Sequence, residues 1–223
     1  MAVKRMLDIV VSAFVLLLFL PILIASAVAI KLESPGPVFY RARRVGRDGS
    51  DLWLLKFRKM TDGVNGLALT GAQDARFTRI GRFLARSKLD ELPQLWNVLV
   101  GGMSLVGPRP EDRQFVDLHA AAFERILSVR PGVTGLCQLA FAKESDILDP
   151  NDRVGHYLER ILPQKVALDL LYVEQGTFAS DVKLLVWTVL PVILRRNVAV
   201  NRVNGGLTLR KRPSEEVLPS PAE

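Results

Sequence analysis

The sequence has a single cysteine, Cys137, and only two histidines, His119 and His156. A lone cysteine excludes an internal disulfide framework and suits a reducing compartment. Such a residue is more often a small buried hydrophobe than a nucleophile. The histidines have no ligand partners at metal-binding spacing, and no serine–histidine constellation accompanies them. We therefore expect a chemistry that uses no thiol, no histidine-bound metal and no serine–histidine pair.

Aromatic residues are also scarce, at 7% of the chain, whereas positive charge is abundant. The net charge is +7, and residues 1–60 hold ten Lys or Arg against four Asp or Glu. A basic half that adjoins an apolar segment favours contact with anionic lipid headgroups or phosphates. The same charge also fits a protein that is not an enzyme, namely a membrane-anchored basic protein that binds nucleic acid or anionic lipid. Phe77, Phe83 and Trp96 lie near the basic cluster, but their spacing is typical of a core rather than of base stacking.

The longest apolar stretch, Met6–Ile30, contains one charged residue, Asp8. It exceeds the ~20 apolar residues that a membrane-spanning helix needs. Ala25-Ser26-Ala27 nominally fits a signal-peptidase site, but the apolar region is too long and a basic, disulfide-free domain follows. A single span is the second interpretation, yet cations flank both ends, so neither end suits the outside of the cell. Those cations are Lys4 and Arg5 before the stretch, and Lys31, Arg41, Arg43, Arg44 and Arg47 after it.

A re-entrant helix, which enters and leaves the membrane by the same face, is the third interpretation. Pro21 lies near the centre of the stretch, where it removes a backbone hydrogen bond and kinks the helix. Such a membrane-helix break would return both basic ends to one headgroup layer. These residues leave the choice between a re-entrant and a spanning helix open.

The rest of the chain predicts mixed, mostly helical secondary structure. Asp48-Gly49 between β-prone runs predicts a short hairpin. Apolar periodicity and breakers predict the helices, which we place at 77–86, 92–99, 111–127, 151–174 with a break near Pro163, and 180–196. Loops are expected at 61–75, 107–110 and 130–135.

Three regions follow from this pattern. Residues 1–33 form the membrane helix and residues 34–202 form one domain. Residues 203–223 are polar with several prolines, so we expect a disordered tail.

Two adjacent acids, Asp90 and Glu91, open an apolar helical pattern beside five positive charges: Arg76, Arg79, Arg82, Arg86 and Lys88. Ser87-x-x-Asp90 fits a capping box, so a helix cap alone explains the acids. Adjacent helical positions point about 100° apart, which excludes a dyad that shares one proton. Asp90 can instead be a nucleophile or metal ligand, and Glu91 a general base or a group that orients a phosphate. Neither acid alone decides between capping and catalysis.

Arg109 is the main phosphate-binding candidate. Pro108 and Pro110 fix its backbone, and a guanidinium binds phosphate oxygens through paired hydrogen bonds. Lys56, Arg58 and Arg86 are weaker candidates, because basic side chains are more often simply solvated.

A series of ordered motifs runs from Lys4 to about Arg196. They are Lys4-Arg5-x-Leu7-Asp8, Gly36-Pro37-Val38-Phe39-Tyr40, Arg44-Val45-Gly46, Lys56-Phe57-Arg58-Lys59-Met60, Asp74-x-Arg76-x-Thr78-Arg79-Ile80-Gly81, Leu89-Asp90-Glu91-Leu92-Pro93-Gln94-Leu95, Met103-Ser104-Leu105-Val106-Gly107-Pro108-Arg109-Pro110, Arg130-Pro131-Gly132-Val133-Thr134-Gly135 and Asp169-x-x-Tyr172-Val173. In them the chain resembles the monotopic polyprenyl-phosphate phosphoglycosyl transferases, which initiate bacterial exopolysaccharide, capsule and O-antigen synthesis.

The resemblance implies an α+β fold, mostly helical, with a re-entrant membrane helix, interfacial amphipathic helices and a catalytic domain on the cytoplasmic face of the bacterial inner membrane. It implies transfer of a sugar phosphate from a UDP-sugar to polyprenyl (undecaprenyl) phosphate, without nucleic acid as a partner. Asp90 would attack the β-phosphorus, form an aspartyl-phosphosugar intermediate and release UMP, while Glu91 assists the acceptor. Mg²⁺ at Asp90 would neutralise the diphosphate, as two anions approaching a carboxylate require. The sequence leaves the sugar and the oligomeric state, including a homodimer, open.

Three departures from the family pattern stand out. The family usually breaks its membrane helix at Ser-Pro, whereas this chain has Leu20-Pro21. The family commonly has an arginine five residues before the aspartate that corresponds to Asp90. In this chain that position is Ala85, and an arginine, Arg86, follows it. After Gly135 the family often continues Trp-x-Gln-Val-Asn-Gly, and the different segment at 136–160 bears on substrate recognition.

Overall fold

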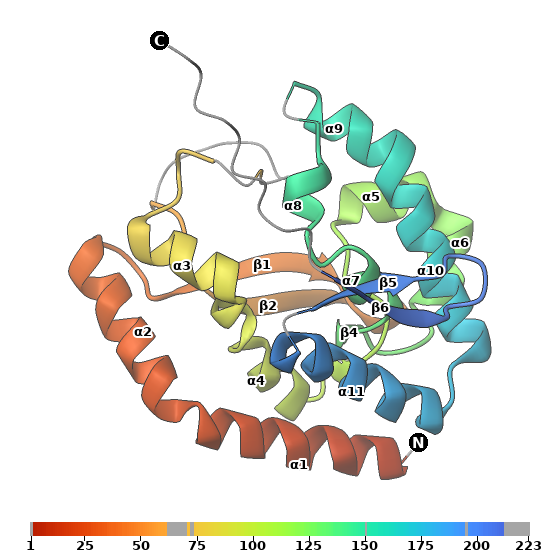
Figure 1. The fold of residues 1–223 in the computed structure, drawn as a ribbon, viewed down its shortest axis with the longest axis horizontal. Coiled ribbons are helices and arrows are strands. Elements are labelled where there is room, and N and C mark those ends of the chain that lie inside the picture. Colours follow the sequence, from red (N-terminus) through yellow and green to blue (C-terminus); the bar gives the residue numbers. More distant parts are fainter. Residues whose placement is uncertain (1, 62–70, 72–73, 150, 195, 212–223) are drawn as a thin grey trace.

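The computed structural model describes residues 2–61, 71, 74–149, 151–194 and 196–211 (Figure 1). The described chain is a mostly helical α+β structure with small two-stranded sheets, as the sequence predicted for the fold class. Its helices are α1 (Ala2–Leu18), α2 (Leu20–Glu33), α3 (Arg79–Ser87), α4 (Gln94–Leu99), α5 (Arg113–Leu118), α6 (Ala120–Ile126), α7 (Leu136–Ala140), α8 (Glu144–Ile147), α9 (Arg153–His156), α10 (Leu162–Gln175) and α11 (Phe178–Ile193). Shorter turns are the 3₁₀ segments η1 (Arg47–Gly49) and η2 (Leu89–Glu91) and the π-helical segment η3 (Tyr157–Ile161).

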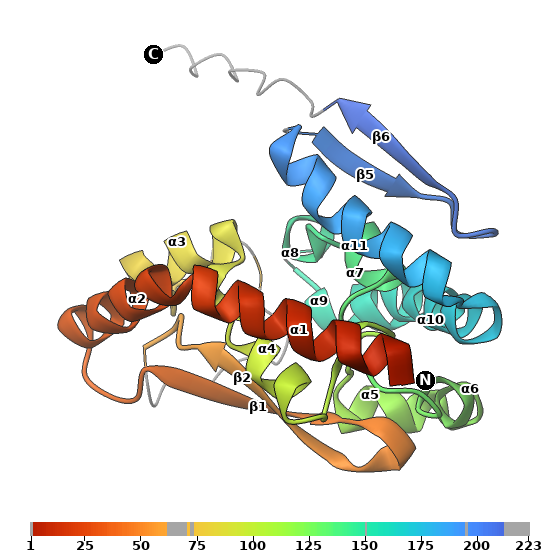
Figure 2. The same cartoon turned by 90° about the horizontal axis from the view of Figure 1, so that it is seen from below.

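The N-terminal apolar stretch forms two helices, α1 and α2, that meet at an angle of 61°. Their break falls at Phe19, and Pro21 lies in the first turn of α2, where its missing N–H leaves no hydrogen bond unmade. Among the described residues no single helix is long and apolar enough to cross a membrane, although by length and composition this bent pair together would be. The pair follows the lower and left edge of the molecule in Figure 1 and crosses its near face in Figure 2, with α1 beside α4 and α2 beside α3.

Both ends of the α1–α2 pair are tied to the rest of the chain. At the first end, Asp8 is buried and accepts hydrogen bonds from Ser104 Oγ and from the Leu105 amide at 2.9 and 3.0 Å. At the other end, Glu33 accepts hydrogen bonds from the Arg79 and Ile80 amides, which begin α3. A carboxylate at a helix N-terminus satisfies amides that lack partners within the helix.

The predicted hairpin is confirmed as strands β1 (Phe39–Val45) and β2 (Asp51–Phe57), paired antiparallel with Val45 opposite Asp51. Asp48 in the connecting turn has a φ of 56°, a left-handed conformation that aspartate tolerates better than most residues. Ala42, Leu52 and Leu54 face the main apolar core. The hairpin thereby fixes the position of Lys56, Arg58 and Lys59 at its open end.

A second pair of strands, β3 (Ser104–Val106) and β4 (Gly132–Thr134), is parallel. The sequence predicted a loop at 130–135, and this prediction is wrong for the three residues of β4. Gly107 and Gly132 allow the pairing, because a Cβ on Gly132 would lie 2.1 Å from the Gly107 nitrogen. The pairing brings two proline-containing segments, 107–110 and 130–131, side by side.

The remaining helices differ from the predictions at their breaks. The helix expected at 111–127 is divided into α5 and α6 at His119, whose φ of −129° is not helical. The helix expected at 151–174 consists of α9, η3 and α10, and its predicted break near Pro163 is confirmed as a π-helical turn. Phe83 and Trp96, for which a core position was expected, are 61% and 56% exposed on α3 and α4.

The C-terminal region is more ordered than expected. Strands β5 (Arg196–Val200) and β6 (Leu207–Lys211) pair antiparallel, so the prediction of a disordered tail from residue 203 is wrong as far as Lys211. The hairpin packs on α7 and α11 (Figure 2). Residues 212–223 and most of the predicted loop at 61–75 lie outside the described residues.

Candidate active site

Asp90 is buried, with 2% of its surface exposed, in the turn η2 between α3 and α4. Lys88 has a φ of 60° and ends α3, so the chain reverses direction just before the acid. Oδ1 of Asp90 is buried and has no hydrogen-bond partner among the described residues. Oδ2 lies 3.4 Å from Lys59 Nζ. A buried carboxyl oxygen without a partner costs free energy, and such costs are typical of functional sites.

The predicted capping box of Ser87 and Asp90 does not form, although both acids do lie in the first turn of a helical segment. Ser87 Oγ donates to the carbonyl oxygens of Phe83 and Leu84 within its own helix. Neither η2 nor α4 has a side-chain cap, and Pro93 occupies the N-cap position of α4. The burial of Asp90 therefore needs another reason.

Glu91 has different surroundings from Asp90. Lys56 Nζ on β2 donates to its Oε1 at 2.9 Å, and Arg109 Nη2 lies 4.0 Å from the same oxygen. Burial by itself would raise the pKa of Glu91, but the charges of Lys56 and Arg109 lower it below the usual value. Three segments far apart in the sequence thus meet at Glu91, and the predicted residues Asp90, Glu91, Lys56 and Arg109 form one site.

Arg109 is held by the β3–β4 pairing. The Gly107 amide donates to Thr134 O at 3.0 Å, and the Gly132 amide donates to Pro108 O at 2.8 Å. The Arg109 side chain remains 35% exposed, so part of this side chain is accessible from solvent. This arrangement fits the predicted role of a pre-ordered phosphate-binding arginine.

A buried polar cluster lies behind the Arg109 segment, and the sequence did not predict it. Lys165 Nζ on α10 donates to the Tyr157 hydroxyl at 2.8 Å and to Glu111 at 3.1 Å, and lies 3.1 Å from Glu144. The Tyr157 hydroxyl donates to Glu111 at 2.7 Å. Burial alone would lower the pKa of Lys165, but Glu111 and Glu144 raise it. The available signal was a lysine at a core position of an otherwise apolar helix face.

Two other predicted residues do not join the acids. Arg58 is 5% exposed, and its guanidinium donates to Ser34 O, Ser34 Oγ and Pro35 O, where it ties the end of α2 to the hairpin. Arg86 is exposed on α3, and among the described contacts it has none with Asp90 or Glu91. Cys137 is fully buried and burial raises the pKa of its thiol, which confirms that it is not poised as a nucleophile.

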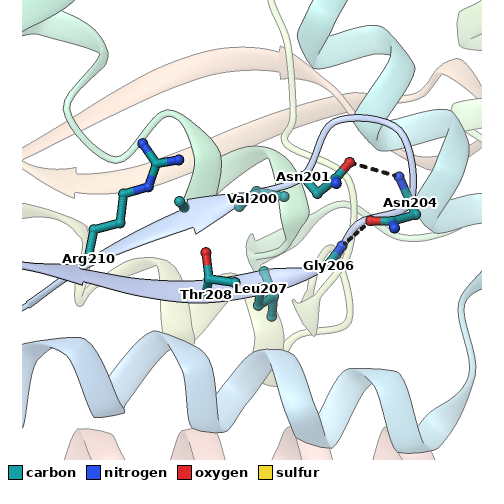
Figure 3. A pocket seen from close by; sticks show the side chains of 8 residues that line it. Val200, Asn201, Asn204, Gly206, Leu207, Thr208 and Arg210 are labelled. Carbon is teal, nitrogen blue, oxygen red and sulfur yellow. Dashed lines mark hydrogen bonds between the residues drawn. The ribbon is translucent and has the colours of Figure 1, made fainter.

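A cavity of about 330 Å³ lies on the β5–β6 hairpin, and none of its lining residues belongs to the acid site (Figure 3). Asn201 and Asn204 use their side-chain oxygens to accept turn amides, at 3.3 Å from Asn204 N and 2.9 Å from Gly206 N. These polar groups serve the turn, so the cavity adds no chemistry to the site.

The site can accommodate Mg²⁺ through Asp90. In the described ranges no group of three or more His, Cys, Asp or Glu could hold a metal ion by itself. Mg²⁺, however, is commonly bound by one or two carboxylates together with substrate phosphates. Among the described residues Oδ1 of Asp90 has no hydrogen-bond partner and is free to coordinate a metal ion, whereas Oε1 of Glu91 accepts a hydrogen bond from Lys56.

The site thus combines a buried carboxylate with cations that remain partly exposed, a set of groups suited to binding phosphates. The chain matches the model of the bacterial sugar transferase family over residues 1–195, and it belongs to that family.

Curated relatives are similar over most of this chain. It is 39% identical over 191 residues to a UDP-glucose:undecaprenyl-phosphate glucose-1-phosphate transferase of Caulobacter vibrioides, covering 83% of this chain and 68% of the relative. It is 39% identical over 180 residues to a UDP-N-acetylgalactosamine-undecaprenyl-phosphate N-acetylgalactosaminephosphotransferase of Aeromonas hydrophila, covering 77% of this chain and 42% of that protein. It is 37% identical over 207 residues to the exopolysaccharide production protein PSS of Rhizobium leguminosarum bv. phaseoli, covering 87% of this chain and 97% of that protein. The chain therefore spans less than half of the length of the Aeromonas relative. The names of the relatives specify different sugars, glucose in one and N-acetylgalactosamine in another.

Proposed function

We propose that the chain is a phosphoglycosyl transferase that moves a sugar phosphate from a UDP-sugar to polyprenyl phosphate. The products are polyprenyl-diphosphate-sugar and UMP, in the first membrane step of exopolysaccharide or glycoconjugate synthesis. The names of the relatives support a UDP-sugar donor and undecaprenyl phosphate as acceptor. The observation that carries the proposal is the buried Asp90 carboxyl, which has one oxygen without a hydrogen-bond partner within the described ranges and cations beside the acid pair.

The reaction has two displacements at one phosphorus. An Asp90 carboxylate oxygen attacks the β-phosphorus, the bond to the bridging oxygen breaks, and its electron pair leaves with UMP. A phosphate oxygen of the acceptor then attacks the aspartyl-phosphosugar, and the Asp90 carboxylate leaves. Each step exchanges one P–O bond for another, so no oxidant or further reactant is required.

Glu91 holds Lys56 and Arg109 in place for these steps. A phosphate monoester has a second pKa of about 6, so the attacking oxygen of the acceptor is mostly ionised at neutral pH. Glu91 assists the acceptor by orienting the two cations toward its phosphate rather than by removing a proton. Mg²⁺ held by Asp90 would, when bound, neutralise charge on the diphosphate.

We also propose that α1 and α2 form a re-entrant element at the cytoplasmic face of the bacterial inner membrane. The pair exposes large apolar side chains, among them Met6 at 63%, Phe14 at 64% and Leu17 at 72%. Both of its ends bind the same folded domain, one through Asp8 and the other through Glu33. A spanning helix would place these ends on opposite faces of the bilayer. Exposed Phe83 and Trp96 would extend the apolar surface, as interfacial helices require.

The test is UMP release from a panel of UDP-sugars with polyprenyl phosphate and Mg²⁺. Wild type should release UMP and form a covalent sugar-phosphate adduct, and Asp90→Asn should do neither. Asp117→Asn, at an exposed acid of α5, is the matched control and should behave as wild type. Folded wild type that releases no UMP from any donor would overturn the function, and an active Asp90→Asn would overturn the nucleophile.

A further inference from the structure

Lys59 is the cation with which Asp90 makes its ion pair among the described residues. The two side chains differ in exposure, at 30% for Lys59 and 3% for Asp90. A phosphate that approaches the buried acid from solvent can therefore contact the lysine as well.

The Lys59–Asp90 contact leaves the lysine able to donate elsewhere. Its length of 3.4 Å exceeds the 2.7–2.9 Å of a charge-assisted hydrogen bond, whereas the neighbouring Lys56–Glu91 contact is 2.9 Å. The Lys59 ammonium also lies 5.6 Å from the centroid of the Phe77 ring, within cation–π range. Its three donor hydrogens have no hydrogen-bond acceptor among the described residues, so they are available to phosphoryl oxygens.

The backbone of Lys59 is fixed against the start of α3. Its carbonyl oxygen accepts a hydrogen bond from the Thr78 amide at 3.2 Å. A Cβ on Gly81 would lie 1.9 Å from the same oxygen, so glycine is needed for this close approach. Because α3 leads directly to the turn that carries Asp90, the lysine and the acid are positioned by one helix.

The last turn of α3 supplies no cation to Asp90 among the described contacts. Position 85, where the family resemblance places an arginine, is alanine in this chain, and Arg86 is exposed. Lys59 is thus the positive charge that this sequence places at the acid.

We propose that Lys59 is a catalytic residue that compensates the negative charge of the phosphoryl group during attack by Asp90. As the carboxylate oxygen bonds to phosphorus, negative charge passes from the acid to the phosphoryl oxygens, and Lys59 stays paired with it. The lysine transfers no proton. This proposal rests on the proposed function and assigns a residue to its first step.

The experiment measures single-turnover UMP release without polyprenyl phosphate, using the full chain and a UDP-sugar that wild type accepts. Lys59→Met removes the charge, Lys59→Arg keeps it, and Lys183→Met, at an exposed lysine of α11, is the control. Lys59→Met should slow UMP release by about 10²–10³-fold, the usual loss when one transition-state donor is removed. The donor concentration that gives half of the maximal single-turnover rate should change much less, Lys59→Arg should stay within about tenfold of wild type, and the control should equal wild type.

Three results would overturn the assignment: an unchanged rate in Lys59→Met, equal losses of rate in Lys59→Met and Lys59→Arg, or a change confined to the half-saturating donor concentration. Thermal unfolding is measured in parallel, and if Lys59→Met does not fold, Lys59→Gln takes its place in the comparison with Arg. If wild type releases UMP and Lys59→Met and Lys59→Gln release it as fast, the role of Lys59 is refuted but the proposed function is not. Wild type that releases no UMP would refute the proposed function as well.

Discussion

Asp90 and Glu91 are neighbours in the sequence, yet their carboxyl groups meet different partners. Glu91 shares one oxygen between Lys56 and Arg109, whereas one buried oxygen of Asp90 has no hydrogen-bond partner in the described part of the chain. An acid with satisfied charges stabilises the structure, and a buried acid with unmet hydrogen bonds costs stability. This difference supports the proposed division into a positioning acid, Glu91, and a reactive acid, Asp90.

Stability and activity should separate at these two positions. Glu91→Gln leaves Lys56 and Arg109 without their counter-charge, so the free energy of unfolding should fall by roughly 2 kcal/mol. Asp90→Asn should change it by less than about 1 kcal/mol, since the lost ion pair is partly exposed, while UMP release disappears. Chemical denaturation of both variants in the same detergent tests this difference. A larger loss of stability in Asp90→Asn than in Glu91→Gln would contradict it.

Single residues were predictable where sequence motifs isolated them, and unpredictable where tertiary contacts select the partner. The acids and Arg109 stand out by adjacency and by flanking prolines. Lys59 lies in the same segment as Lys56 and Arg58, and only the fold shows which of the three meets Asp90, which meets Glu91 and which holds a backbone turn.

At the scale of elements, the contact between β2 and α3 determines the spacing of the site. Lys59, just beyond β2, and Asp90, just beyond α3, approach each other because Gly81 lets helix and strand end touch. Any side chain at position 81 must displace either the backbone of Lys59 or the start of α3.

Gly81→Ala should therefore act at a distance. A Cβ 1.9 Å from the Lys59 carbonyl oxygen forces a backbone shift, which should cost about 3 kcal/mol of stability and most of the UMP release. Gly102→Ala is the control, because its nearest contact is a terminal methyl of Leu52 at 3.1 Å, which can rotate away. Unfolding and single-turnover assays measure both effects. Equal behaviour of the two variants would show that the β2–α3 contact is not critical.

Element types were easier to predict than their pairing. The β1–β2 hairpin follows from alternation and a turn dipeptide, which are local signals. The parallel β3–β4 pair has three residues in each strand and joins positions 28 apart, Ser104 with Gly132, so no local pattern reveals it. The division of α5 from α6 at His119 likewise has no glycine or proline to mark it.

For the whole molecule, the attachment of both ends of α1–α2 to one domain predicts the topology. Val3→Cys and Leu32→Cys, at positions 60% and 83% exposed, should both react with an impermeant maleimide from the cytoplasmic side only. Cys137 is buried and gives a low background, and Val203→Cys on the domain is the control. Labelling of residues 3 and 32 from opposite sides would establish a span and refute the re-entrant proposal.

The contact between Lys4 and Asp181 also affects the order in which contacts form while the chain is being synthesised. These residues are 177 positions apart, and Lys4 in addition donates to Val106 O and Tyr172 Oη. At a synthesis rate of about 5–20 residues per second, Asp181 is made roughly 10–35 s after Lys4. During that interval α1 can already bind β3, because Asp8 accepts hydrogen bonds from Ser104 and the Leu105 amide. The ion pair of Lys4 with α11 therefore forms later than the contacts of α1 with β3, and the rate of synthesis sets how long Lys4 lacks this carboxylate.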